Sequence, residues 1–214
     1  MKMTHVRFAR ILTGPLLFCG CLSLFLAGCL SRPALRRENF ALQDPPLLQT
    51  APAAQGAVLQ LRSVKVSPIF AVRALVYRTG QDSYELDPYA GFLISPERAL
   101  AIPIRTYLRN SGLFQDVVEP GSPIQPDEFL EIHVSEFYGD FRKSEAPDAV
   151  VSLQAILVES VSDDGSKIAL NRHYNRRVPL KENTAAAVVA GYDEALAQIM
   201  KELLSDLAEA KSAK

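Results

Sequence analysis

The sequence predicts an α+β fold, in which an antiparallel β-sheet carries two main α-helices packed on one face. Three observations support this prediction. Apolar residues alternate with polar ones in several short stretches between residues 58 and 178, which is typical of half-buried strands. A proline-capped helical pattern follows Ser95, and a longer helical pattern begins near residue 183. Short strands with two helices against one side form a simple two-layer arrangement.

The first strands are predicted at residues 58–66, 74–78 and 83–86. Within residues 58–66 the apolar alternation slips by one position near Arg62 and Ser63, so we expect a β-bulge there. The second and third stretches flank Thr79-Gly80-Gln81-Asp82, which is typical of a hairpin connection.

The first helix is predicted to begin after Ser95. This serine suits the N-cap, Pro96 suits the first helical position, and an acid follows in the first turn. Gly112 is a candidate C-cap, and Pro103 is expected to bend the second turn. The apolar face of this helix carries Leu100, Ile104, Tyr107 and Leu108.

The later elements are predicted as four strands and a long helix. The strands cover residues 113–118, 130–135, 150–158 and 168–178, and Asp163-Asp164-Gly165-Ser166 forms the turn before the last of them. The helix begins near Asn183-Thr184. Its apolar residues at helical spacing are Val188, Val189, Tyr192, Leu196, Ile199, Leu203 and Leu207.

The amino-terminal segment has the layout of a secretory signal peptide. Three basic residues precede an apolar run at residues 11–27, which ends in Leu26-Ala27-Gly28-Cys29. This ending is very similar to the bacterial lipobox, which implies cleavage before Cys29 and attachment of acyl chains such as palmitate. A transmembrane anchor is the alternative, but the run is short of the roughly 20 apolar residues that a bilayer requires. Cys21 is a weaker competing site.

Three regions follow from this interpretation: a lipoprotein signal peptide at residues 1–28, a lipidated tether at 29–57 and one domain at 58–210. The tether is rich in Pro, Ala and Gln, although residues 40–42 suit a short edge strand. Leu30 follows the modified cysteine, and this residue indicates sorting to the outer membrane, with the domain facing the periplasm.

The mature chain is predicted to be mildly acidic and to contain no free thiol. All three cysteines lie at or before the cleavage point, so no internal disulfide is expected. Removing residues 1–28 lowers Lys and Arg from 23 to 20 against 24 Asp and Glu, a formal charge of −4. This charge gives no general attraction to nucleic acid, so we expect no nucleic-acid partner.

The candidate chemical sites have simple structural alternatives. His133 and His173 lie on predicted strands without other ligands at metal-binding spacing, so we expect no metal. The segment at 163–165 lacks the ligand run of a calcium loop and is interpreted as a turn. No nucleophile motif is present, so we expect neither an enzyme nor a cofactor. The basic cluster Arg172, His173, Arg176 and Arg177 suits a solvated strand face or an acidic partner.

The order of several motifs resembles the ABC-type transport auxiliary lipoproteins. The motifs are the lipobox, the Pro-rich tether, Ala74-Leu75-Val76-Tyr77-Arg78, Tyr84-Glu85-Leu86-Asp87-Pro88-Tyr89 and the helix end Leu108-Arg109-Asn110-Ser111-Gly112-Leu113-Phe114. The resemblance covers most of residues 58–207. Many members carry a tryptophan before the first helix, whereas this chain has none, and Phe92 is the aromatic residue at that place.

The resemblance implies a non-catalytic outer-membrane lipoprotein of an ABC/MCE-type envelope lipid transport system. Its implied partners are an MCE-family periplasmic protein with its ABC transporter, and the membrane through the anchor at Cys29. A homo-oligomeric ring would match the symmetric end of such a partner. Two alternatives stay open: a regulatory outer-membrane lipoprotein of cell-wall synthesis, and a lipoprotein enzyme, for which no supporting residues are present.

Overall fold

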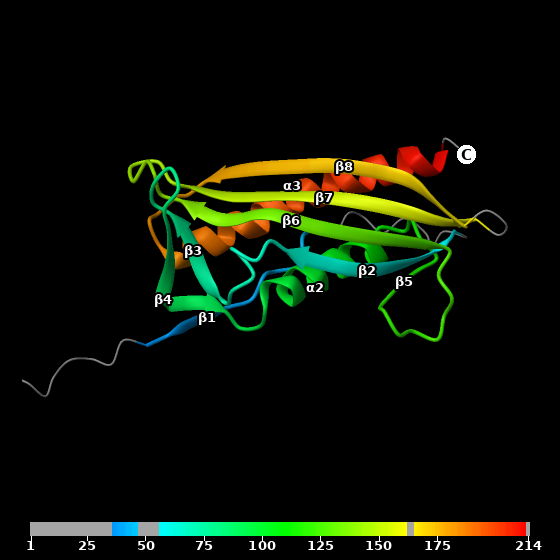
Figure 1. The fold of residues 1–214 in the computed structure, drawn as a ribbon, viewed down its shortest axis with the longest axis horizontal. Coiled ribbons are helices and arrows are strands. Elements are labelled where there is room, and N and C mark those ends of the chain that lie inside the picture. The colour runs from blue at the N-terminus through cyan, green and yellow to red at the C-terminus, as the bar shows by residue number, and fades with distance from the viewer. Residues whose placement is uncertain (1–35, 47–55, 162–164, 213–214) are drawn as a thin grey trace, which may run out of the picture. The chain divides into compact units, whose positions relative to one another are not determined.

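The computed structural model describes residues 36–46, 56–161 and 165–212, and residues from Arg37 onward belong to one compact unit. Within these residues ten elements follow one another (Figure 1). They are β1 (Glu38–Phe40), β2 (Val58–Val66), β3 (Ala74–Arg78), β4 (Tyr84–Phe92), α2 (Pro96–Asn110), β5 (Asp116–Val118), β6 (Glu128–Asp140), β7 (Asp148–Val161), β8 (Gly165–Pro179) and α3 (Ala185–Ser212).

The eight strands form one mixed sheet with β6 at its centre. One side of β6 pairs antiparallel with β7, which pairs antiparallel with β8. The other side of β6 pairs in parallel first with β2 and then, at its carboxyl end, with β3. Because β1 also joins β4 in parallel and β5 joins β2 in parallel, the expectation of a purely antiparallel sheet is corrected. Within the described sheet only the pairs β3–β4, β6–β7 and β7–β8 are antiparallel.

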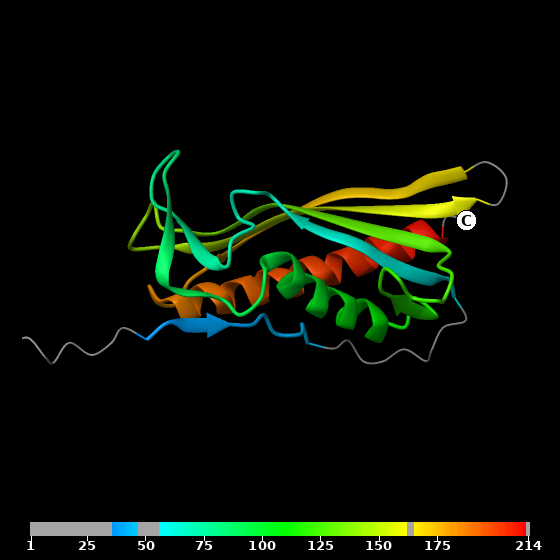
Figure 2. The same cartoon turned by 60° about the horizontal axis from the view of Figure 1, so that its bottom comes forward.

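The predicted α+β fold with two helices against one face of the sheet is confirmed (Figure 2). Helix α3 packs along β7 and β8, and α2 packs beneath β2. The register of β2 against β6 shifts between Leu61 and Ser63, which is the predicted β-bulge. The core between the layers includes the fully buried residues Leu59, Leu100, Leu130, Leu153, Tyr192 and Leu196.

Helix α2 keeps the predicted limits but differs in detail at both ends. Ser95 occupies the N-cap with an extended backbone, yet its side chain makes no capping hydrogen bond. The helix continues through Pro103, which is buried, because packing of the apolar face outweighs the lost backbone hydrogen bond. Gly112 follows the C-cap residue Ser111 and has a φ of 70°, a left-handed conformation that glycine adopts without strain.

Part of the segment predicted as a tether lies against the domain. Strand β1 pairs with β4, and Phe40 and Leu42 pack against the core. The backbone N–H of Gln43 donates to Oδ1 of Asp193 on α3 at 2.9 Å, and Pro45 is buried. Residues 38–46 therefore belong structurally to the domain, whereas residues 47–55 lie outside the described residues.

Candidate functional site: a charged pocket beside the β6–β7 loop

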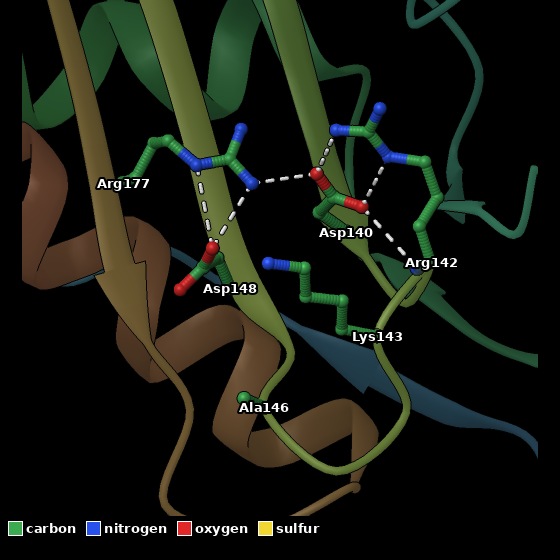
Figure 3. Close-up of a pocket in the computed structure, with 6 residues that line it drawn as sticks. All are labelled: Asp140, Arg142, Lys143, Ala146, Asp148 and Arg177. Carbon is green, nitrogen blue, oxygen red and sulfur yellow. Dashed lines mark hydrogen bonds and ion pairs between the residues drawn. The ribbon is translucent and has the colours of Figure 1, made fainter. Parts of the chain in front are cut away.

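The most developed polar site lies where β6 and β8 end and β7 begins (Figure 3). The antiparallel register places Asp140 opposite Asp148 and brings the last residues of β8 beside them. The loop 141–147 closes the site from the end of the sheet. Together these segments enclose a pocket of about 420 Å³. Its lining residues are Asp140, Arg142, Lys143, Ala146, Asp148 and Arg177.

A buried carboxylate organises this pocket. The side chain of Asp140 is only 4% exposed. Arg142 donates to both of its oxygens, from Nε to Oδ1 at 2.9 Å and from Nη2 to Oδ2 at 2.6 Å. Arg177 donates from Nη2 to Oδ2 of Asp140 at 2.6 Å and to Oδ2 of Asp148 at 2.9 Å. Asp140 therefore joins the loop to β8 through charge-assisted hydrogen bonds.

These hydrogen bonds also determine the protonation of the groups. The hydrogen bond from Arg142 lowers the pKa of Asp140 well below its usual range, and the bond from Arg177 acts in the same direction against the cost of burial. The same bond to Asp140 raises the pKa of Arg142 above its ordinary value. Asp140 and both arginines are thus charged at neutral pH.

The pocket has donors that its own carboxylates do not use. Within the described residues, Nη1 of Arg142, Nη1 of Arg177 and the amino group of Lys143 make no hydrogen bond. Figure 3 shows the amino group of Lys143 directed into the space between Asp148 and Asp140. Three cations face two carboxylates, so the pocket suits an anionic group such as a phosphate or a carboxylate. Both carboxylates are engaged by arginine, which makes them poor general bases.

The two predicted histidines lie on the face of the sheet opposite the helices. His133 pairs with Gln154, which pairs with His173, so the two imidazoles are two strands apart. Lys65 extends this row on β2. Among the described residues no group of three or more His, Cys, Asp or Glu could hold a metal ion. In this row Lys65 and His173 are exposed and His133 is half-buried.

The predicted basic cluster on β8 is divided between the two faces of the strand. Arg176 pairs with Glu202 on α3, whereas Arg177 lies on the other side, in the charged pocket. Tyr174, on the helix side, donates its hydroxyl to Asp206 at 2.7 Å. The alternation of side chains along a strand explains this division.

The motifs that carry the family resemblance have structural roles. Tyr77 donates its hydroxyl to Oδ2 of Asp87 at 2.7 Å and packs edge-on against the ring of Phe141. These contacts hold the β3–β4 hairpin against the end of β6. Phe92 stacks on Phe137 with ring centroids 5.3 Å apart. It is buried in the core.

The charged pocket is not predictable from the sequence pattern. The sequence places Arg177 in a basic cluster, but its partner Asp140 lies 37 residues earlier in the chain. The only local signal is the acid and base two residues apart at positions 140 and 142. Two other sequence predictions fall outside the described residues. They are the lipid attachment at Cys29 and the turn at Asp163-Asp164.

Comparison with known proteins agrees with this architecture. The family model "ABC-type transport auxiliary lipoprotein component" matches residues 40–203, and the chain therefore belongs to this family. No curated protein matches the chain.

Solved structures share the fold. A crystal structure of protein XCC0632 from Xanthomonas campestris, assigned to the family DUF330, superposes with a TM-score of 0.69 at 20% identity. That match covers 81% of this chain and 96% of the other. A second crystal structure, of an uncharacterised protein, has a TM-score of 0.62 at 17% identity and covers 80% and 99% of the two chains.

The family name describes a lipoprotein, and lipoproteins are attached to a membrane by their acyl chains. Among residues 36–46, 56–161 and 165–212, no helix combines the length and hydropathy needed to cross a bilayer.

Proposed function

We propose that the chain is a non-catalytic outer-membrane lipoprotein subunit of an ABC/MCE-type envelope lipid transport system, in which it acts as a docking component. The observation that carries the proposal is the family match over residues 40–203 behind a lipobox ending in Cys29. The described residues form a sheet with two covering helices and a pocket suited to anions. Such a subunit acts through its contacts and its position.

The partner in this proposal is an MCE-family periplasmic protein together with its ABC transporter. Two surfaces of the domain are open to protein contacts. In the described sheet β8 pairs only with β7, so the outer edge of its 15 residues can accept a further strand. The sheet face opposite the helices exposes His173 and Asn175 on the same strand. Several copies arranged head to tail would match a rotationally symmetric partner.

Crosslinking in intact cells tests the partner. A photo-reactive amino acid at His173 should trap a product with the MCE component and a ladder of this chain. Lys201, exposed on α3 away from the sheet, is the matched control position. If both positions gave only monomer joined to a peptidoglycan synthase, the transport function would be replaced by the regulatory one.

The anchor is tested separately by replacing the modified cysteine. A thiol that receives two acyl chains, with a third chain on the amino group, binds a membrane firmly, whereas a single chain binds only marginally. Mass spectrometry of the membrane fraction should therefore detect an acylated amino-terminal Cys29. A Cys29→Ala variant should keep its signal peptide and contain no acyl group, and normal maturation of that variant would contradict the assignment.

A further inference from the structure

Strand β1 determines where the chain leaves the domain. Glu38 pairs with Ala90 and Phe40 with Phe92, and the contacts of residues 40–46 continue this attachment. Glu38 is only the ninth residue after Cys29. Nine fully extended peptide units span about 30 Å at most. A domain attached in this way stays much closer to its anchor than a free tether up to residue 57 would allow.

The register identifies the end of the sheet from which β1 starts. β3 runs parallel to β6, with Tyr77 opposite Gly139, and β4 runs back antiparallel to β3. Because β1 is parallel to β4, its amino end points toward the end of the sheet at which β6 finishes. The same end carries the β3–β4 hairpin and the β6–β7 loop (Figure 1). We call it the hairpin end.

The hairpin end exposes large apolar side chains. Leu86 is 57% exposed and Tyr89 is 47% exposed, both on β4. Between them Oδ1 of Asp87 accepts the backbone N–H groups of Tyr89 and Ala90, each at 2.8 Å. This local hydrogen bonding helps to fix the exposed segment. Exposed tyrosine and leucine side chains suit the boundary between lipid headgroups and acyl chains.

The charged pocket lies at the same end. The loop 141–147 carries Arg142 and Lys143, which line the pocket and have N–H donors that the two carboxylates do not use. Apolar side chains next to cationic donors are the combination that an interfacial membrane contact requires, because the former enter the headgroup layer while the latter bind phosphate oxygens.

We propose that the hairpin end of the domain rests on the lipid surface that holds the anchor. Leu86 and Tyr89 enter the interfacial layer, and Lys143 meets lipid headgroup phosphates. This inference rests on the proposed lipid anchor at Cys29. It fixes the orientation of the domain: the opposite end of the sheet, with the end of β7, the start of β8 and the segment 119–127, points away from the membrane toward a partner.

Site-directed spin labelling of the full lipidated chain tests the orientation. All three native cysteines lie at or before position 29, and in the proposed mature protein Cys29 is acylated, so a single new cysteine can be labelled alone. The test positions are Leu86→Cys, Tyr89→Cys and Lys143→Cys. The controls match them in exposure at the opposite end: Ile168 is 61% exposed, Ile124 is 46% exposed, and Lys167 is also exposed.

The register sets the separation between test and control positions. Glu85, the residue before Leu86, lies level with Gly139 of β6 through Tyr77 of β3. Ile168 lies level with Phe129 of β6 through Val158 of β7. These two ends of β6 are about 33 Å apart, from ten residues at about 3.3 Å each. A lipid surface that contacts one end therefore leaves the other in water.

The measurement compares two collision rates of each spin label. One is the rate with oxygen, which partitions into lipid, and the other is the rate with a nickel chelate, which stays in water. The protein is reconstituted in vesicles of phosphatidylethanolamine and phosphatidylglycerol. The oxygen-to-nickel ratio should be several-fold higher at positions 86 and 89 than at 168 and 124. The oxygen-to-nickel ratio at position 143 should lie between those of the two groups, and it should exceed the ratio at position 167.

Two results would overturn the inference and leave the anchor intact. In the first, the protein stays bound to the vesicles while all labels are equally accessible to the nickel chelate. In the second, positions 168 and 124 are the protected ones. If the native protein is not acylated and leaves the vesicles, the proposed anchor itself fails, so the two failures are distinguishable. If added free phosphate lowers the oxygen-to-nickel ratio at position 143 alone, the pocket binds phosphate without a lipid.

Discussion

At the scale of single residues, Asp140 connects three segments of the chain. Its buried carboxylate binds Arg142 from the following loop and Arg177 from β8, and Arg177 also pairs with Asp148 at the start of β7. Charge-assisted hydrogen bonds therefore hold the loop 141–147 to the strands at this end of the sheet.

Replacing this carboxylate should lower the free energy of unfolding. In Asp140→Asn the two arginines lose a charged acceptor, and one amide group is left partly unsatisfied in a buried position, at a cost of about 1–3 kcal/mol. Urea unfolding monitored by circular dichroism measures the difference. Glu119→Gln is the matched control, because Glu119 is exposed in its pair with Arg105 and its loss should change stability by less than about 0.5 kcal/mol. Equal effects for both variants would contradict the role of Asp140.

The effect of Asp140 should depend on pH in a defined direction. Its pKa is lower in the folded protein than in the unfolded chain, where it is about 3.9. The stabilisation is therefore fully present above the unfolded value and is lost as the pH falls through the folded value. The difference between the native chain and Asp140→Asn should shrink as the pH is lowered below about 4. A difference that grew under acid conditions would exclude this linkage.

At the scale of elements, close packing of α3 on the sheet depends on a glycine. A Cβ placed on Gly191 would lie 2.5 Å from the Cβ of Ala149 on β7 and 3.0 Å from Cδ2 of Leu180. Ala149 is fully buried and belongs to the core of the sheet, so it has no room to move. The helix therefore accepts a residue of poor helix propensity in order to approach β7 closely.

Gly191→Ala should destabilise the domain although alanine is the better helix former. Overpacking costs about 1–3 kcal/mol, which exceeds the roughly 1 kcal/mol gained in propensity. Thermal unfolding shows whether Gly191→Ala is less stable or more stable than the native domain. Ala190→Gly, at the exposed preceding position, should lose about 1 kcal/mol through propensity alone. A higher melting temperature for Gly191→Ala would mean that the helix can shift away from β7.

Strand β1 adds an edge strand to the sheet, two residues earlier than the one suggested at residues 40–42. A soluble form starting at Arg37 should be more stable than one starting at Gln55, because the shorter form loses the β1–β4 pairing and the buried Pro45. Comparison of their urea midpoints measures this contribution. A Phe40→Ala variant of the longer form should fall between them. Equal midpoints for the two forms would show that β1 adds nothing to stability.

At the scale of the whole molecule, the described residues are held together by one apolar core between sheet and helices. The chain carries no cysteine after position 29, and no described cluster suits a metal. The melting temperature of a soluble form starting at Arg37 should therefore be unchanged by a chelator or a reductant. A decrease of several degrees with either reagent would reveal a metal or a disulfide that stabilises the fold.

The sequence alone determined most elements and the family. Periodicity predicted β3, α2 and α3 closely because each has a regular apolar face with clear end signals such as Pro96 and Gly112. The phase slip near Arg62 predicted the bulge in β2, since a change of face is visible in the residues themselves. Short motifs around Tyr77 and Ser111 indicated the family, because each motif consists of residues that are contiguous in the chain.

Tertiary structure alone decided the pairing of strands, the course of residues 38–46 and the charged pocket. Parallel pairing of β2 and β3 with β6 depends on contacts between distant segments, which local alternation cannot encode. The sequence suggested a short edge strand at residues 40–42, but its bounds at Glu38–Phe40, its parallel pairing with β4 and the packing of residues up to 46 come from the tertiary structure. Asp140 and Arg177 meet because the register of β6, β7 and β8 brings the ends of three strands together.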